Sequence, residues 1–178
     1  MFLEHALATA SAIVDGTSYW LDDHYLRDVL APITGDVSSY LISGLNDGVT
    51  EALTNAAARR DALRHLTTGD PAAYGDPCAG IGQGWESASA TALALLVADM
   101  ATATEGAPAP LTGPHALAWA STSNGDSDSI ACMAGALIGA AHESAGYWSE
   151  NGLTPTFEPR YARELGEARY GHLAGSAH

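Results

Sequence analysis

The sequence predicts an all-α protein, folded as a single domain over residues 1–178. Apolar side chains recur at helical spacing through most of the chain, and no stretch alternates apolar and polar residues as a half-buried strand does. Hydrophobic residues make up 47% of the 178 residues, which is enough to form a buried core. The expected architecture is a bundle of many short helices.

Two helices are expected near the start of the chain. The first has an apolar face that runs from Leu3 to Val14, and Gly16 follows it as a stop signal. The second covers residues 22–31 and is expected to end at Pro32, because a proline has no N–H group for the helical hydrogen bond.

Two more helices are expected in the following part of the chain. One covers residues 37–43 and is closed by Gly44. The other, residues 47–66, is long and amphipathic. The arginines of this long helix are expected on its solvated side: Arg59, Arg60 and Arg64.

The rest of the chain begins with a loop and continues with helices. Residues 67–84 are rich in Gly, Pro and Asp, which predicts an ordered loop. Residues 85–103 are apolar almost all round, which predicts a buried central helix. Shorter helices are expected over residues 115–121 and 130–142, and a last amphipathic helix is expected over residues 160–170.

The charge of the chain excludes several classes of partner. Acidic residues number 21 and basic residues 7, all of them Arg, so the net charge is -14. Binding to DNA or RNA needs a basic patch that neutralises phosphates, and binding to an anionic membrane surface needs the same. The longest apolar run, residues 130–141, is also too short to span a bilayer. We therefore expect neither a nucleic acid nor a membrane as a partner.

The cysteines and the first residues favour a cytoplasmic protein. Cys78 and Cys132 are far apart in sequence, so they form no disulfide framework of the kind that secreted domains carry. The stretch from Met1 to Ala10 lacks the basic region that begins a signal peptide. A cytoplasmic location is the expectation that follows.

A run of oxygen-bearing side chains precedes the helix expected at residues 130–142. Asp126 and Asp128 are two residues apart, so in an extended segment their carboxylates can point the same way, and Ser129 adds a hydroxyl. Such hard oxygen ligands suit Mg²⁺, Mn²⁺ or Ca²⁺. The same residue types are also favoured as helix caps, and the two interpretations are compatible.

Two segments carry a resemblance to a known family. The sequence Gly-Asp-Ser-Asp-Ser-Ile-Ala at residues 125–131, followed by Ala-Gly-Ala-Leu-Ile-Gly-Ala at residues 134–140, resembles the C-terminal signature of the ADP-ribosylglycohydrolase family. Gly-Gln-Gly-Trp at residues 82–85, which opens an Ala- and Leu-rich helix, resembles the glycine-rich substrate loop of that family. The similarity extends over about residues 82–146, with both motifs in the family's order.

The resemblance implies an orthogonal multi-helix bundle that holds two Mg²⁺ ions. It further implies a hydrolase that removes ADP-ribose from a modified protein or small molecule by Mg²⁺-assisted cleavage at the terminal ribose. It assigns no catalytic residue, but it gives two sets of site residues. The metal ligands are Asp126, Asp128 and Ser129, and the substrate-binding residues are Gly82, Gln83, Gly84 and Trp85.

One half of the family pattern is missing from this sequence. Family members carry a Thr-Asp-Asp motif in an earlier half, and two carboxylates balance only one divalent ion. The nearest substitute, Leu-Asp-Asp-His at residues 21–24, also has the form of an ordinary acidic helix start. The fold can therefore be a truncated one, which leaves two alternatives to an autonomous enzyme. One is a non-catalytic member that binds ADP-ribose or serves as a structural module, and the other is half of a two-chain enzyme whose complementary chain supplies the missing motif.

Overall fold

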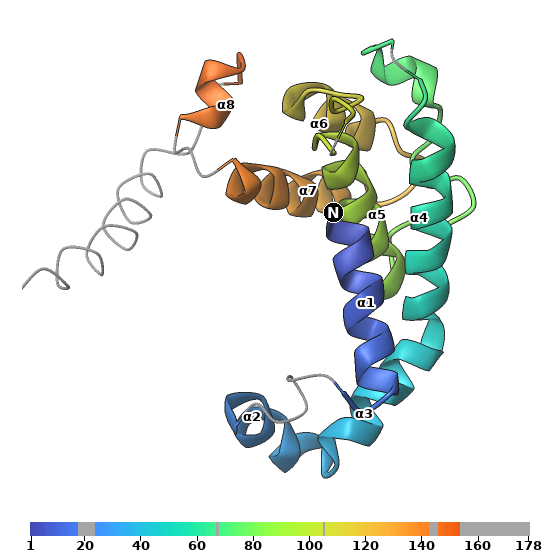
Figure 1. The fold of residues 1–178 in the computed structure, drawn as a ribbon, viewed down its shortest axis with the longest axis vertical. Helices are drawn as coiled ribbons and strands as arrows, with labels where there is room; N and C mark the ends of the chain where they lie inside the picture. Colours follow the sequence, from blue (N-terminus) through green and yellow to red (C-terminus); the bar gives the residue numbers. More distant parts are fainter. Residues whose placement is uncertain (18–23, 67, 105, 143–145, 154–178) are drawn as a thin grey trace, which may run out of the picture.

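The computed structural model describes residues 1–17, 24–66, 68–104, 106–142 and 146–153, and these residues form an all-α structure (Figure 1). In that part of the chain there is no β-strand, and Thr104 and Ala107 form an isolated bridge. The prediction of an all-α class is confirmed.

In chain order the elements are α1 (Phe2–Val14), α2 (His24–Thr34), α3 (Val37–Gly44), the π-helical turn η2 (Leu45–Val49), α4 (Thr50–Leu63), the 3₁₀ turn η3 (Pro71–Tyr74), α5 (Ser87–Met100), α6 (Gly113–Ser121), α7 (Ser127–Ala141) and α8 (Tyr147–Glu150).

Helix α5 is the centre of the core. It packs against α1, α4, α6 and α7, and its side chains at Leu93, Leu96 and Val97 are completely buried (Figure 1). Because these helices cover most of α5, its sequence is apolar almost all round, and Ser87 and Thr91 near its start are the exposed positions. This confirms the buried central helix that the sequence predicts, but its bounds are narrower than the predicted residues 85–103, because α5 covers Ser87–Met100 and Trp85 lies in the loop before it.

Helix α2 continues past the proline that was expected to end it. It runs from His24 to Thr34, with Pro32 inside its last turn. A proline so close to the end removes only one helical hydrogen bond, and the helix stops instead at Gly35, whose φ is +76°. The predicted end of this helix at Pro32 is therefore wrong, because the helix extends to Thr34.

The long helix expected at residues 47–66 is shorter and begins later. Its first residues belong to η2, where Gly48 has a φ of +106° and breaks the regular helical geometry. Helix α4 then covers Thr50–Leu63. A residue with a side chain is disfavoured at such a φ, so Gly48 sets the bend between α3 and α4.

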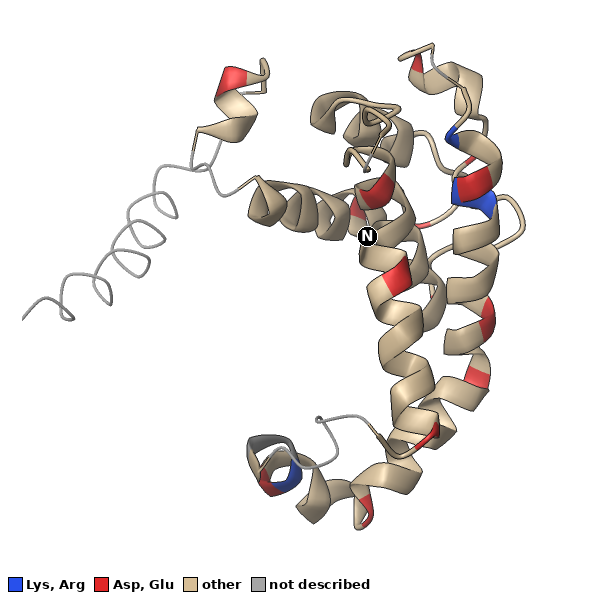
Figure 2. Ribbon diagram, viewed as in Figure 1, with Lys and Arg blue, Asp and Glu red and all other residues tan. Residues whose placement is uncertain are grey.

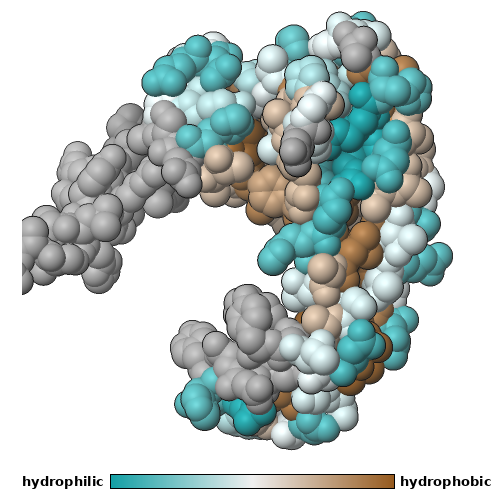
Figure 3. All heavy atoms as spheres, viewed as in Figure 1, coloured by the Kyte–Doolittle hydropathy of each residue, from teal (hydrophilic) through white to brown (hydrophobic). Residues whose placement is uncertain are grey.

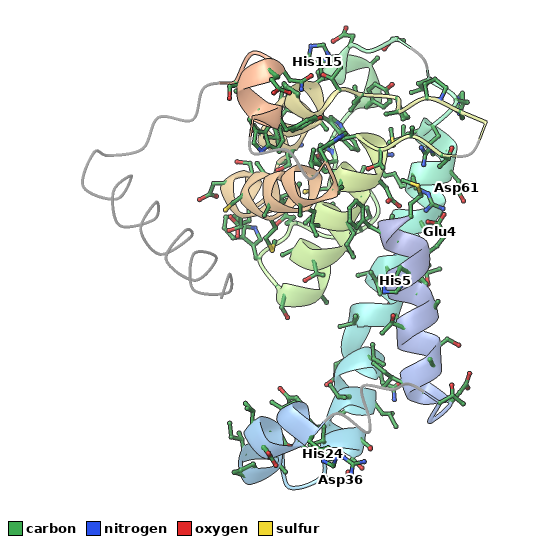
Figure 4. The ribbon with its side chains drawn as sticks, turned by 60° about the vertical axis from the view of Figure 1, so that its left-hand side comes forward. Glu4, His5, His24, Asp36, Asp61 and His115 are labelled. Atoms are coloured by element: carbon green, nitrogen blue, oxygen red, sulfur yellow. The ribbon has the colours of Figure 1, made fainter. Side chains whose placement is uncertain are left out.

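Arg60 is buried, contrary to the expectation that the arginines of this helix face solvent. Only 6% of Arg60 is exposed, and its Nη1 lies 3.1 Å from Oδ2 of Asp99, which is completely buried on α5. A buried carboxylate is costly unless a positive group and hydrogen bonds compensate it, so the arginine is drawn inward. Arg60 also pairs with Asp61 and with Glu4 on α1; the last two lie close together in Figure 4.

The same buried carboxylate fixes the start of α1. The backbone N–H groups of Phe2 and Leu3 donate to Asp99 over 2.7 and 3.2 Å. These are N–H groups that the first turn of a helix leaves without intrahelical partners. Asp99 therefore joins α1, α4 and α5 through one carboxylate.

Helices α2 and α3 lie at the end of α1 and α4 that is remote from α6 and α7 (Figure 1). Acidic residues are spread along the helices, and few basic residues accompany them (Figure 2). Hydrophobic and hydrophilic surface alternate on the face shown in Figure 3. Among the residues that the structure describes, the large apolar side chains that are exposed are Val14, Val29, Ile33, Tyr40, Trp85 and Leu153.

Two expectations fall wholly or partly outside the described residues. The helix expected at residues 160–170 is one of them. Of the segment at residues 21–24, the structure describes only His24. Within the described part of the chain, no helix combines the length and apolarity that crossing a bilayer requires.

Candidate functional site

The two segments that the sequence singles out lie against each other. Residues 82–85 form the loop that leads into α5, and Asp126 is the residue before α7. The backbone N–H of Asp126 donates to the carbonyl oxygen of Gln83 over 2.8 Å. The substrate loop and the metal-ligand run implied by the resemblance therefore belong to a single region, at the junction of α5 and α7.

Two glycines make this close approach possible. A Cβ on Gly125 would lie 1.9 Å from the carbonyl oxygen of Gln83, and a Cβ on Gly84 would lie 2.9 Å from Cδ1 of Ile130. Gly84 also has a φ of +77°, where residues with side chains are strained. Gly125 thus allows the two backbones to pack at this distance, and Gly84 leaves room for the side chain of Ile130.

The loop uses half of its backbone N–H groups internally. Gly84 donates to Oγ of Ser89 over 3.2 Å, and Gly82 donates to the carbonyl oxygen of Cys78 over 3.4 Å. The N–H groups of Gln83 and Trp85 donate to no other described residue. A ligand bound at the loop therefore has these two backbone N–H groups available as donors.

A cavity of about 250 Å³ opens beside the loop. Trp85, which is 70% exposed, forms part of its wall. Its lining residues are Ile81, Gly82, Gln83, Trp85, Glu86 and Ser89. Three of the four residues expected to bind substrate therefore line one cavity, while the fourth, Gly84, is buried behind it.

A second hollow adjoins the first. Its volume is about 220 Å³, and it shares Ile81, Glu86 and Ser89 with the cavity. Sequence reasoning missed the acidic and amide side chains that complete it, Asp47, Glu51 and Asn55. Glu51 and Asn55 are four residues apart on α4, which places them on one face of that helix, and this spacing was the signal that could have found them. Asp47 lies before α4, in η2.

Asp126 and Asp128 lie close together at the start of α7. A hydrogen bond with the Asp126 carboxyl group, followed by hydrogen bonds from the backbone N–H groups of Asp128 and Ser129, holds the pKa of Asp128 below its ordinary value. Asp126 occupies the capping position, but its carboxylate makes no capping hydrogen bond. Within the described structure, the Asp126 carboxylate is thus not used as a helix cap.

The start of α7 differs from the expectation in one detail. The helix begins at Ser127 and not at residue 130, so Asp128 and Ser129 lie in its first turn and not in an extended segment before it. A helix can begin here because the N–H of Ser127 is already satisfied by the carbonyl oxygen of Gly125, over 2.9 Å. Ser129 is half-buried and Asp128 is exposed.

The donor set suits one hard divalent cation. Asp126, Asp128 and Ser129 together offer carboxylate and hydroxyl oxygens, and Mg²⁺ commonly takes one or two carboxylates and completes its shell with water or substrate phosphate. Two carboxylates balance the charge of one such ion, whereas the family resemblance implies two ions. Among the described residues, no group of three or more His, Cys, Asp or Glu side chains is placed to hold a metal.

His24, the described residue of the segment at residues 21–24, lies far from this region. It begins α2 and is exposed, and Figures 1 and 4 show α2 at the end of the molecule remote from α7. Asp22 and Asp23 lie outside the described residues.

Comparisons with protein-family models, with curated proteins and with solved structures found no match to this chain.

Proposed function

We propose that this protein is a Mg²⁺-dependent hydrolase that releases ADP-ribose from a modified protein or small molecule. The observation that carries the proposal is the hydrogen bond from Asp126 N–H to the carbonyl oxygen of Gln83. It joins a glycine-rich loop with free backbone donors to a pair of adjacent carboxylates. A diphosphate-containing ligand needs backbone N–H donors, and a divalent cation needs carboxylate ligands.

The loop supplies what an acidic protein needs to accept an acidic ligand. The N–H groups of Gln83 and Trp85 can donate to the diphosphate without any basic side chain. The first turn of α5, which begins at Ser87, adds the partial positive charge of a helix N-terminus beside the cavity. The exposed Trp85 indole offers an apolar face and edge for a ribose or a base.

The carboxylate pair supplies the second half of the chemistry. Asp126, Asp128 and Ser129 would hold Mg²⁺, which polarises bound hydroxyl groups and lowers the pKa of bound water. In the hydrolysis, water adds to the anomeric carbon of the terminal ribose. The bond from that carbon to the leaving group breaks, and the leaving group takes up a proton. The ligand partners of this proposal are ADP-ribose and a protein that carries it.

The proposal is tested by ADP-ribose release from a labelled, ADP-ribosylated protein, measured with Mg²⁺ and with EDTA. Release should require Mg²⁺, and Asp126→Asn and Asp128→Asn should each slow it by more than about tenfold. Asp28→Asn, an exposed acid on α2, removes the same charge away from the site and should leave the rate unchanged. Release that persists in EDTA, or in both site variants, would contradict the proposal.

Two further outcomes identify the alternatives. Binding of ADP-ribose without any release would indicate a non-catalytic binder. Release that appears only after a chain carrying a Thr-Asp-Asp motif is added would indicate one half of a two-chain enzyme.

A further inference from the structure

The chain immediately before the glycine-rich loop is held by two neighbouring helices. The Arg59 guanidinium on α4 donates to the carbonyl oxygens of Tyr74 and Asp76, over 3.1 and 2.8 Å. The indole N–H of Trp119 on α6, which is completely buried, donates to the carbonyl oxygen of Gly75 over 2.7 Å. The backbone at residues 74–76 is therefore a fixed point next to the site.

The Asp76 side chain connects this fixed point to the segment that enters α7. Its Oδ1 accepts from the backbone N–H of Asn124 over 3.3 Å, and its Oδ2 accepts from Nδ2 of Asn124 over 3.0 Å. The two residues are 48 positions apart in sequence. Oδ1 also accepts from the backbone N–H of Cys78 over 3.0 Å, so both oxygens of the carboxylate are used.

A local role explains only one of these three bonds. The bond to Cys78 is a common side-chain turn of an aspartate with the backbone two residues later. The two bonds to Asn124 cross between loops, and Asn124 is followed directly by Gly125, which packs on the carbonyl group of Gln83. The position of Asn124 thus determines where the backbone of Asp126 meets the glycine-rich loop.

We infer that Asp76 and Asn124 are positioning residues for the site. Through their two hydrogen bonds they hold the entry to α7 against the loop at residues 82–85, and so set the place of the Asp126–Asp128 pair relative to the cavity. The effect of this positioning on metal binding rests on the proposed function. Its structural part, the placement of Asp126, can be measured without any ligand.

The test exchanges the hydrogen-bonding roles of the two residues. Asn124→Asp replaces the Nδ2 donor with a carboxylate that faces the Asp76 carboxylate, so it removes one bond and adds repulsion. Adding Asp76→Asn restores a complementary pair, because the new amide can donate to the new carboxylate and its oxygen can still accept from the backbone. Asn124→Ala is the milder variant, which loses only the Nδ2 bond and serves if Asn124→Asp fails to fold.

The first readout is amide hydrogen exchange at Asp126, whose N–H donates a hydrogen bond to the carbonyl oxygen of Gln83 in the native structure. Asn124→Asp should speed this exchange by about tenfold or more while amides of α5 keep their protection, and the double variant should restore it. Asp36→Asn, which alters an aspartate that caps α3, is the matched control and should not change exchange at Asp126.

The second readout is affinity for Mg²⁺ alone, measured by calorimetry. Partners that orient a metal ligand typically change affinity by about 10–100-fold, so Asn124→Asp should weaken binding by about tenfold and the double variant should recover it. Unchanged exchange at Asp126 in Asn124→Asp, or no recovery in the double variant, would overturn the positioning role. Absence of Mg²⁺ binding in the unaltered protein would overturn the proposed function instead, while the exchange result still decides the role of Asp76.

Discussion

At the scale of single residues, the site depends on the absence of a side chain at Gly125. Its Cα faces the carbonyl group of Gln83 so closely that a methyl group has no room. From the sequence alone, a glycine directly before Asp126 is explained equally well by a turn or by a helix cap. The structure shows that a glycine is needed here because two loops are in contact, and no local sequence pattern reveals that contact.

Gly125→Ala should therefore separate the two loops. The new Cβ would stand 1.9 Å from the Gln83 carbonyl oxygen, so the backbone must shift, and the expected loss in free energy of unfolding is about 1–3 kcal/mol. Urea-induced unfolding measures it. Gly44→Ala is the matched control, because Gly44 has helical φ and ψ and no atom within 4 Å of the added methyl group. The control should change stability by no more than about 1 kcal/mol, in the stabilising direction. Equal effects of the two substitutions would contradict the close contact.

At the scale of the helices, a single buried carboxylate joins α1, α4 and α5. Asp99 accepts from the first turn of α1 and from Arg60 on α4. Burial opposes the charged state of Arg60, but hydrogen bonds with Asp61 and Asp99 outweigh it and hold the arginine pKa above its ordinary value. The guanidinium thus stays charged, and the helices are joined by an ion pair within the core.

Asp99→Ala should destabilise the protein strongly. It leaves the Arg60 guanidinium without its buried partner and leaves two N–H groups of α1 without an acceptor, so we expect a loss of about 3–5 kcal/mol. Asp61 pairs with the same arginine, but the Asp61 side chain is 67% exposed. Asp61→Ala should therefore lower the free energy of unfolding by no more than about 1 kcal/mol. Thermal unfolding of both variants provides the comparison. A loss below about 1 kcal/mol for Asp99→Ala would contradict the structural role of the pair.

The helices show which parts of the fold could be predicted from sequence. The apolar periodicity of α1 and the all-round apolar surface of α5 identified these elements, because both patterns depend on local spacing alone. The burial of Arg60 could not be predicted, since its partner is 39 residues away. The sequence likewise singles out residues 82–85 and 126–129 but not the contact between them, because the two segments are far apart in the chain. The role that we infer for Asp76 also depends on a partner 48 residues away.

At the scale of the whole molecule, the net charge of -14 constrains what the site can bind and how. Acidic residues are distributed over the helices in Figure 2, so a phosphate-bearing ligand approaches against the overall field. In the proposed function, backbone N–H groups at the loop and a divalent cation on Asp126 and Asp128 would offset that repulsion. Binding of ADP-ribose should therefore depend on Mg²⁺ more than it would in a basic protein.

The most direct test of the account is calorimetric titration of the unaltered protein with ADP-ribose, once with Mg²⁺ and once with EDTA. If the loop and the carboxylate pair form one site, ADP-ribose binds in the presence of Mg²⁺, and EDTA weakens the affinity by about tenfold or more. Equal affinity in Mg²⁺ and EDTA, or no binding in Mg²⁺, would contradict the assignment of these two segments to one ADP-ribose site.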